Sequence, residues 1–433
     1  MNDNTLHTRR QFLRTGVLGG AVAWTLPVFL EKTFLALDAS AADSLLQTAT
    51  GKDGPILVVL QLAGGNDGLN TVIPYADDAY HIARPKIGIR GDQALKINDH
   101  IALNHKLTGL RGLYDSGDLA ILQGVGYPNP NRSHFRSTDI WQTASDSDRY
   151  EREGWIGRYF DSCCQGADPG VGVSVGRQAP LAFAAKTPKG ISLNKPEAFR
   201  FISENASDPA ATEEMFRGMT GADDNAGGSV ESLSGHSGGD GDTLDYLRRT
   251  SLDAQVSSDK ILEITRKFRS SVTYPGNQLA SGLNLVARLI AGGMPTRIYY
   301  VSQGGYDTHS GQLGAHDRNL GDLDASISAF VADLKTQGNF DRVMLMTFSE
   351  FGRRVVENAS GGTDHGAAAP MFVLGGGVKP GLYGQQPSLT RLNQGDLIYN
   401  VDFRSVYATV LENWLKAPSE MVLKRKFPTM SFV

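Results

Sequence analysis

Acidic and histidine residues stand beside runs of apolar residues at several places in this sequence. Acids or histidines follow three such runs, in "GGNDG", "GGYDTHSG" and "SEFG", and a histidine precedes a fourth run in "TDHGAAAPMFVL". The candidate metal ligands at these places are Asp67, Asp307, His309, Glu350 and His365. Carboxylates and imidazoles suit Zn or Mn, and two such ions can hold both the attacking and the leaving oxygen of a displacement at phosphorus. The residue types therefore predict a divalent metal cofactor of one or two ions.

Each candidate also has an explanation that involves no metal. Asp67 could shape a turn by hydrogen bonding to its own backbone, and Glu350 could be an acid that favours a helix N-terminus. Asp307 and His309 are harder to explain in this way, because one of them would be left as a buried polar group without a partner. His365 is followed by "GAAAP", which gives it no helical face to fill. Taken together, the four places favour metal binding.

A nucleophile for such chemistry is offered by "NPNRSHFRSTDIW", where a loop turns into a helical pattern. Ser133 stands at the predicted start of this helix, so it could be an N-cap. The free N–H groups at a helix start would also hold an anionic substrate and stabilise a serine alkoxide, and the two roles are compatible. Arg132 and Arg353 are candidate clamps for the anion, or else solvated surface charges.

Strands and helices must alternate to place these residues. The apolar runs in "PILVVLQL", "LAILQGVG", "RIYYVSQ", "VMLMTF" and "PMFVL" are typical of strands buried on both faces. Helical patterns separate them, the clearest over 313–334 and another over 401–415. This alternation predicts an α/β fold, a doubly wound and mostly parallel sheet with helices on both faces. Ligands of such sheets bind beyond the carboxyl ends of the strands.

The N-terminus predicts export. The segment "TRRQFLR" precedes the apolar run "TGVLGGAVAWTLPVFL" and the small residues "ASA", which is typical of a twin-arginine signal peptide over 1–41. A single membrane anchor or a chance pair of arginines is the alternative. The expected partner is the twin-arginine export machinery, the expected location is the periplasm or the extracellular space, and no stable membrane anchor remains after processing. We expect residues 42–433 to form one domain, with a Gly/Ser/Asp-rich surface excursion at 205–243.

Composition excludes some classes of protein. The chain has 433 residues, of which 40% are hydrophobic and 20% charged, so neither a disordered chain nor a multi-span membrane protein fits. Removal of 1–41 leaves 38 basic and 43 acidic residues, a net charge of −5, which argues against nucleic-acid binding. The only cysteines, Cys163 and Cys164, are adjacent; we expect two buried thiols, with a vicinal disulfide as the alternative.

The order of these residues resembles the alkaline phosphatase superfamily, which includes sulfatases and cofactor-independent phosphoglycerate mutases. More closely, "GGNDGLNTVIP", "RSHFRSTDIW", "GGYDTHSGQ", "SEFGR" and "GGTDHGAAAPMFVLGG" behind a twin-arginine signal resemble a bacterial family of exported proteins whose shared domain has no known function. That second resemblance covers nearly the whole mature chain. The resemblance to the superfamily implies an alkaline-phosphatase-like fold and a small-molecule ester as substrate.

The superfamily resemblance implies one metal held by Asp307, His309 and His365, and a second held by Asp67, Glu350 and Ser133. It makes Ser133 the nucleophile of a phosphate or sulfate ester hydrolase and Asp364 a residue that supports His365 or shapes a turn. Two departures stand out: Phe351 occupies a place where the superfamily commonly has histidine, and the sulfatase Cys/Ser-x-Pro-x-Arg signature is absent. The competing expectation is a noncatalytic exported protein that keeps the scaffold and binds a ligand or a cell-envelope partner.

Overall fold

The computed structural model describes residues 54–164, 167, 169–176, 179–186, 190–193 and 260–433. In this part of the chain a nine-stranded sheet runs in the order β11-β5-β10-β9-β1-β8-β6-β7, and β14 pairs with β5 at a further position. The strands are β1 (Ile56–Leu62), β5 (Leu119–Gly126), β6 (Gly172–Val175), β7 (Ile191–Leu193), β8 (Ile298–Gln303), β9 (Val343–Phe348), β10 (Ala369–Gly375), β11 (Gly381–Tyr383) and β14 (Val401–Asp402).

The central strands are buried along their whole length, as their continuous apolar sequences predict. Every residue of β1, β5 and β9 is buried, because helices cover both faces of the sheet. β1 pairs in parallel with β8 and β9, and β6 pairs in parallel with β7 and β8. The predicted α/β fold with a mostly parallel sheet is therefore confirmed.

One antiparallel strand decides where the candidate ligands meet. β10 runs antiparallel to both β5 and β9, so it begins at the edge of the sheet where β1, β5, β8 and β9 end. The segment just before β10 therefore lies at the same edge as the loops that follow those four strands. This arrangement gives His365, which precedes β10, access to residues that follow the parallel strands.

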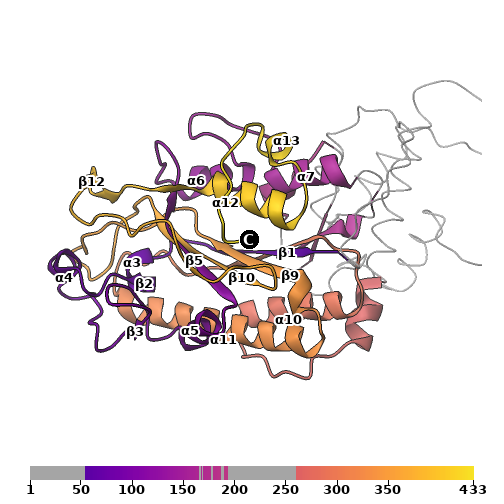
Figure 1. Cartoon of the computed structure of the whole chain (residues 1–433), viewed down its shortest axis with the longest axis horizontal. Helices are drawn as coiled ribbons and strands as arrows, with labels where there is room; N and C mark the ends of the chain where they lie inside the picture. The colour runs from indigo at the N-terminus through magenta and orange to yellow at the C-terminus, as the bar shows by residue number, and fades with distance from the viewer. Residues whose placement is uncertain (1–53, 165–166, 168, 177–178, 187–189, 194–259) are drawn as a thin grey trace, which may run out of the picture.

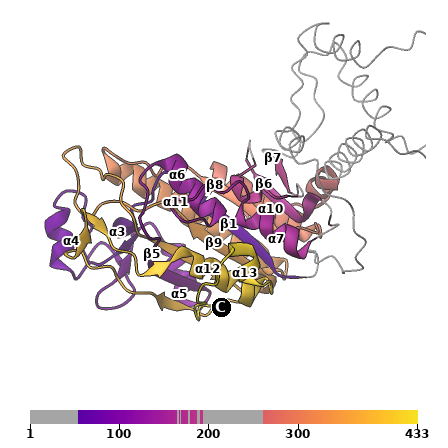
Figure 2. The same cartoon turned by 90° about the horizontal axis from the view of Figure 1, so that it is seen from above.

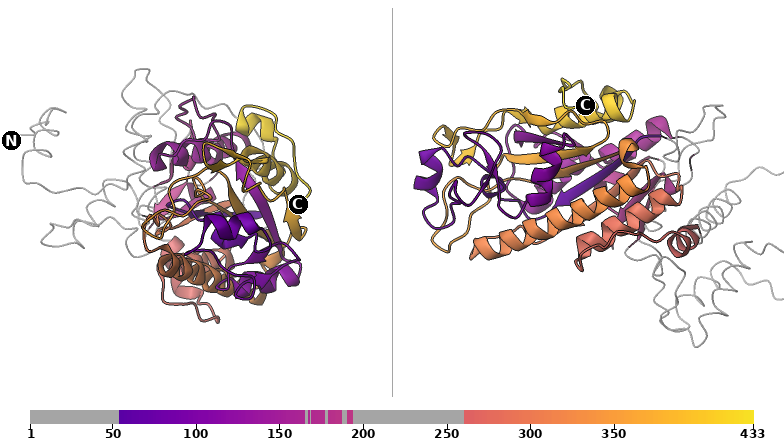
Figure 3. Two further views of the ribbon diagram at one scale, coloured as in Figure 1. Left: turned by 90° about the vertical axis from the view of Figure 1, so that its left-hand side faces the viewer. Right: turned by 60° about the horizontal axis from the view of Figure 1, so that its bottom comes forward.

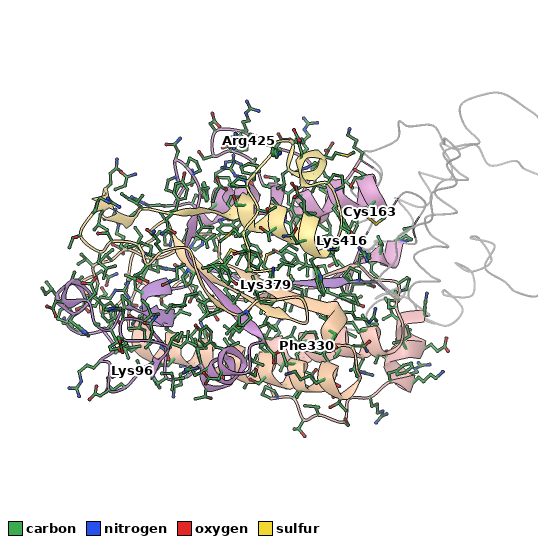
Figure 4. All side chains as sticks on the ribbon, in the orientation of Figure 1. Lys96, Cys163, Phe330, Lys379, Lys416 and Arg425 are labelled. Atoms are coloured by element: carbon green, nitrogen blue, oxygen red, sulfur yellow. A yellow bond between two sulfur atoms is a disulfide. The ribbon has the colours of Figure 1, made fainter. Side chains whose placement is uncertain are left out.

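Two helical layers cover the sheet (Figure 1). One layer consists of α5 (Thr108–Asp115), α10 (Gln278–Ala291) and α11 (Gln312–Thr336). The long α11 and the neighbouring α10 run along this face (Figure 3), and Phe330 of α11 belongs to the core beneath them (Figure 4). The other layer consists of α6 (His134–Thr143), α7 (Trp155–Cys163), α12 (Phe403–Thr409) and α13 (Ser419–Leu423). Its core contains Trp141, Trp155 and Tyr407.

Short elements complete the described fold, and several gather at the end of the molecule that carries α3 and α4, where Figure 1 labels them and Figure 2 shows the same end from above. They are α3 (Gly68–Thr71), β2 (Val72–Ile73), α4 (Asp78–Ala83), β3 (Leu95–Lys96), β4 (Ala102–Leu103), η1 (Pro169–Val171), η2 (Leu181–Phe183), η4 (Phe340–Arg342), β12 (Leu392–Asn393) and β13 (Asp396–Leu397). The helix predicted over 313–334 is α11. The helix predicted over 401–415 begins as β14, continues as α12 and ends in a π-helical turn, η5 (Val410–Trp414).

Three further sequence predictions concern the N-terminal signal peptide, the surface excursion and the two cysteines. The predicted signal peptide at 1–41 and the predicted excursion at 205–243 lie outside the described residues. Among the helices that are described, none combines the length and the apolar character needed to cross a bilayer. The expectation of two thiols was wrong, because Cys163 and Cys164 are joined in a disulfide at the end of α7 (Figure 4).

Candidate metal centre

Three donor atoms form a small triangle at the edge of the sheet where the parallel strands end. His309 Nε2 lies 2.9 Å from His365 Nε2 and 3.0 Å from Asp307 Oδ1, and His365 Nε2 lies 3.1 Å from the same oxygen. The edges of a tetrahedron with metal–ligand bonds of 2.0–2.1 Å are about 3.3 Å. The three atoms are thus spaced almost as the ligands of one tetrahedral ion would be.

The far sides of both imidazoles contact oxygen acceptors. His365 Nδ1 lies 2.8 Å from the carbonyl oxygen of Arg132, and His309 Nδ1 lies 3.3 Å from Asp364 Oδ1. An oxygen without hydrogen can only accept, so we assign the proton of each ring to Nδ1. In the neutral rings the lone pair is then on Nε2, and these lone pairs face each other and a carboxylate. Only a cation between them, an added proton or a metal ion, makes that arrangement favourable.

Asp307 is held as an ionised ligand. Burial raises the pKa of this carboxyl group, but the hydrogen bond and the positive charge of Arg353, together with the nearby His365, outweigh burial and lower the pKa to about 2. Arg353 Nη2 donates to Asp307 Oδ1 at 2.7 Å. The side chain of Asp307 is still 47% exposed, so a ligand or substrate can reach it from solvent.

The buried side chain of Arg353 joins the loops that meet at this edge of the sheet. It is fully buried, and besides Asp307 it donates to the carbonyl oxygens of Gly64, Gly65, Tyr306 and Thr363. An isolated bridge also pairs Arg353 with His365, which joins the loop after β9 to the segment before β10. The Gly64 backbone has φ +117° and lies so close to Asp307 that an added Cβ would be 2.5 Å from the Asp307 nitrogen. This glycine allows the loop after β1 to pack against the centre.

Glu350 lies beside this triangle and is almost completely buried, with 3% of its side chain exposed. Its Oε1 accepts a hydrogen bond from the Gly64 N–H at 2.8 Å and lies 2.9 Å from His134 Nδ1. Its Oε2 has no hydrogen-bond partner among the described residues. His134, the first residue of α6, was not among the residues selected from the sequence. Its position directly after Ser133 was the only signal that could have found it.

Asp67 belongs to a different set of contacts. Its buried carboxylate forms an ion pair with Arg84 at 2.6 Å and accepts a hydrogen bond from the Gln312 side chain. Burial raises the pKa of Asp67, but the charge and hydrogen bond of Arg84 outweigh it, so the pKa lies below its usual value. None of the described hydrogen bonds or ion pairs of Asp67 reaches Asp307 or the histidines. The structure therefore brings four of the five predicted ligands together and sets the fifth apart.

The predicted nucleophile and clamps flank the centre. Ser133 is the exposed N-cap residue of α6, and its side chain makes no capping hydrogen bond. The guanidinium of Arg132 binds Asp396 Oδ2 through Nη2 at 2.6 Å and through Nε at 2.8 Å. The backbone carbonyl oxygen of Arg132 accepts a hydrogen bond from His365. The guanidiniums of both Arg132 and Arg353 are thus engaged by the protein. The roles of these three residues in substrate binding stay predictions.

Comparisons with known proteins are consistent with the resemblance read from the sequence. The profile of a family described as "Protein of unknown function (DUF1501)" matches residues 55–423. None of the curated proteins compared with the chain matches it.

Similar solved structures include three bacterial proteins. For a sulfatase from Pseudoalteromonas the identity is 11%, with 87% of this chain and 71% of the sulfatase covered and a TM-score of 0.35. For alkaline phosphatase from the Antarctic bacterium TAB5 the identity is 14%, the coverage 76% and 95%, and the TM-score 0.31. For a lipoteichoic acid synthase from Listeria monocytogenes the identity is 10%, the coverage 78% and 67%, and the TM-score 0.32.

Proposed function

We propose that this chain, which belongs to the DUF1501 family of proteins of unknown function, is an exported metal-dependent hydrolase of phosphate or sulfate esters. The observation that carries the proposal is the triangle formed by Asp307 Oδ1, His309 Nε2 and His365 Nε2. Catalytic metal sites take the substrate at a coordination position that the protein leaves open, and they can expand to five ligands during the reaction. Export is proposed from the N-terminal sequence, with the twin-arginine machinery as partner and the periplasm or extracellular space as location.

The residues present fit a divalent ion. Carboxylate and imidazole donors suit Zn or Mn. Three carboxylates lie at the centre, those of Asp307, Glu350 and Asp364, and one guanidinium, that of Arg353, lies beside them. The net charge of these four groups is therefore −2. A doubly charged ion held by Asp307, His309 and His365 would balance this charge. When bound, it would supply positive charge against the ester oxygens that become negative during the displacement.

Ser133 is the proposed nucleophile. Its exposed hydroxyl stands at the N-terminus of α6, where backbone N–H groups without helical acceptors can hold an anionic ester group. The serine oxygen forms a bond to phosphorus or sulfur, the bond to the ester oxygen breaks, and the serine proton passes to water. The leaving alkoxide takes a proton from water. A second water then cleaves the phosphoseryl or sulfoseryl bond and regenerates the hydroxyl.

A noncatalytic role is the second candidate, and one observation favours it. The two arginines that could clamp an anion, Arg132 and Arg353, already bind protein acceptors. A protein that binds a ligand or a cell-envelope partner through the same edge of the sheet would need no free arginine. Turnover of phosphate or sulfate esters is expected of the hydrolase and not of the noncatalytic protein.

The test uses the exported chain after loading with Zn²⁺ or Mn²⁺. Aryl phosphate monoesters, aryl phosphate diesters and aryl sulfates are assayed with the wild type, with Ser133→Ala and with Ser281→Ala. Ser281 is a matched control, because it is an exposed serine in the first turn of α10. We expect turnover of at least one ester class that falls to background only in Ser133→Ala. A metal-loaded wild type that hydrolyses none of the esters, or a Ser133→Ala variant that retains full turnover, would contradict the proposal.

A further inference from the structure

We infer that His134 is a fourth protein ligand of the same metal ion, and that Glu350 orients His134 instead of binding a second ion. His134 Nε2 lies 3.4 Å from Asp307 Oδ2. One donor atom from each of His134, Asp307 and His365 lies within 4.8 Å of the others. The inference rests on the proposed function only in requiring that this centre bind a metal. It does not require that the protein be catalytic.

The orientation of the ring is the first reason. All three imidazoles of the centre turn Nε2 toward the Asp307 carboxylate and Nδ1 toward an oxygen acceptor. The three acceptors are Glu350 Oε1 for His134, Asp364 Oδ1 for His309 and the Arg132 carbonyl oxygen for His365. Histidines that bind metals usually donate their other N–H to such an acceptor, which fixes the tautomer and makes the ligating nitrogen more basic. His134 has the same arrangement as the two predicted ligands.

The surroundings of Glu350 are the second reason. Its Oε1 already faces two donors, the Gly64 N–H and His134 Nδ1. No lysine or arginine pairs with this carboxylate among the described residues, although it is nearly fully buried. A buried charge is costly unless it is paired. A carboxylate, an imidazole and a metal ion in series provide the missing positive charge, and they explain why a buried acid stands behind a half-exposed histidine.

A second ion lacks the ligand set that the sequence suggested for it. Asp67 Oδ2 is bound to Arg84 and Glu350 Oε1 is directed at His134, which leaves one oxygen of each buried carboxylate, Asp67 Oδ1 and Glu350 Oε2, without a described hydrogen-bond partner. Neither carboxylate has a described contact with the other. The available donors therefore favour one ion with three imidazoles and one carboxylate over two ions that share them.

Phe351 supports the ring of His134. The Phe351 and His134 ring centroids are 4.9 Å apart, and Phe351 and His365 are 4.5 Å apart. His134 also packs edge-on against His365, with centroids 4.5 Å apart. The sequence suggested that Phe351 leaves an imidazole missing. In the structure this phenylalanine packs against two imidazoles, one of which comes from α6.

Cobalt binding to the full exported chain tests the inference without reference to activity. Co²⁺ replaces Zn²⁺ in such sites and reports its ligands by absorption and by paramagnetic NMR. We expect one Co²⁺ per chain and three hyperfine-shifted, exchangeable ring N–H signals, one each from His134, His309 and His365. Two such signals, or two ions per wild-type chain, would overturn the inference.

Variants supply the second measurement. We expect the Kd for Co²⁺ to rise about 10- to 100-fold in Glu350→Gln and at least as much in His134→Gln, with one N–H signal lost in the latter. His105→Gln is the matched control, because His105 is also half-exposed and lies 3.3 Å from a carboxylate, that of Asp317. It should bind Co²⁺ as the wild type does, and unfolding curves should show that all three variants fold. A folded His134→Gln with wild-type affinity would contradict the assignment. Normal cobalt binding without ester turnover would remove the proposed function and leave this inference standing.

Discussion

Asp67 and Asp307 are a natural pair for comparison. Each follows a parallel strand of the sheet, β1 or β8, and each carboxylate is bound by a buried arginine, Arg84 or Arg353. Asp67 is completely buried, whereas the side chain of Asp307 is 47% exposed and is faced by three imidazole nitrogens. An acid at a strand end is therefore not sufficient for a metal site. Converging lone pairs and an open side distinguish the second carboxylate from the first.

The buried network around Asp67 has a structural role that reaches the metal centre. Arg84 donates to the carbonyl oxygens of Val355 and Arg354, in the loop that follows β9. Gln312, which donates to Asp67, accepts hydrogen bonds from Thr308 and Thr363. Thr308 stands between Asp307 and His309, and Thr363 lies two residues before His365. The buried network around Asp67 thus positions two segments of the metal centre, the one that carries Asp307 and His309 and the one that carries His365.

The largest expected effect is on stability, from removal of Arg84. Arg84→Met leaves Asp67 as a buried charge without its partner, which costs about 3–5 kcal/mol of unfolding free energy. The matched control is Arg90→Met, because Arg90 forms an ion pair with Asp92 that is exposed on both sides and should contribute nothing measurable. Urea unfolding of the metal-free variants measures both changes. Equal unfolding free energies of the two variants would mean that the buried charge of Asp67 is not stabilised by Arg84.

The next effect is on metal affinity, and it separates the two carboxylates directly. Asp307→Asn should weaken Zn²⁺ binding by about 100-fold or more, because it removes a charged ligand and a partner of three imidazoles. Asp67→Asn should leave the Kd for Zn²⁺ within a few-fold of wild type and act on unfolding instead. Competition with a chelating dye measures the affinities. If the wild type bound two Zn²⁺ ions per chain and Asp67→Asn bound one, the two-ion arrangement would return.

The contrast between these carboxylates shows what could be predicted from the sequence. The strands were predictable, because burial on both faces leaves continuous apolar runs such as "VMLMTF". Asp307, His309 and His365 were predictable as neighbours, because strand ends in such a sheet share one edge. The ion pair of Asp67 with Arg84 was not, since it joins the loop after β1 to the end of α4 through tertiary packing. The contact of His134 with Glu350 likewise joins residues 216 positions apart, and no local pattern encodes it.

A smaller effect is expected at the loop that connects the two regions. Gly64→Ala forces a side chain into a backbone at φ +117° and places Cβ 2.5 Å from the Asp307 nitrogen. We expect a loss of about 1–3 kcal/mol in unfolding free energy, together with weaker Zn²⁺ binding, because the ligand-bearing backbone must shift. Gly311→Ala is the control, with φ +53° and no atom within 4 Å of the added Cβ. Its φ lies in the left-handed region that residues other than glycine can adopt, and the added Cβ makes no contact, so the variant should leave Zn²⁺ binding unchanged.

The smallest expected effect is a pH dependence that comes from a histidine of the buried region. Burial lowers the pKa of His316 below its usual value of 6.5, and the ring contacts Asn66 and Thr71 in the interior. As the pH falls below about 6.5, the unfolded chain takes up a proton that the folded ring does not, so the unfolded state is favoured. The contribution of His316 to stability is therefore complete above pH 6.5 and declines as the pH falls toward the folded pKa.

Urea unfolding of the metal-free chain at pH 7.5, 6.5 and 5.5 should show this decline in the wild type and a shallower one in His316→Gln. His81→Gln, which changes a half-buried histidine in the last turn of α4, should retain the wild-type slope. Parallel slopes in His316→Gln and the wild type would mean that His316 takes up its proton equally in the folded and the unfolded chain, which contradicts the effect of burial on this ring.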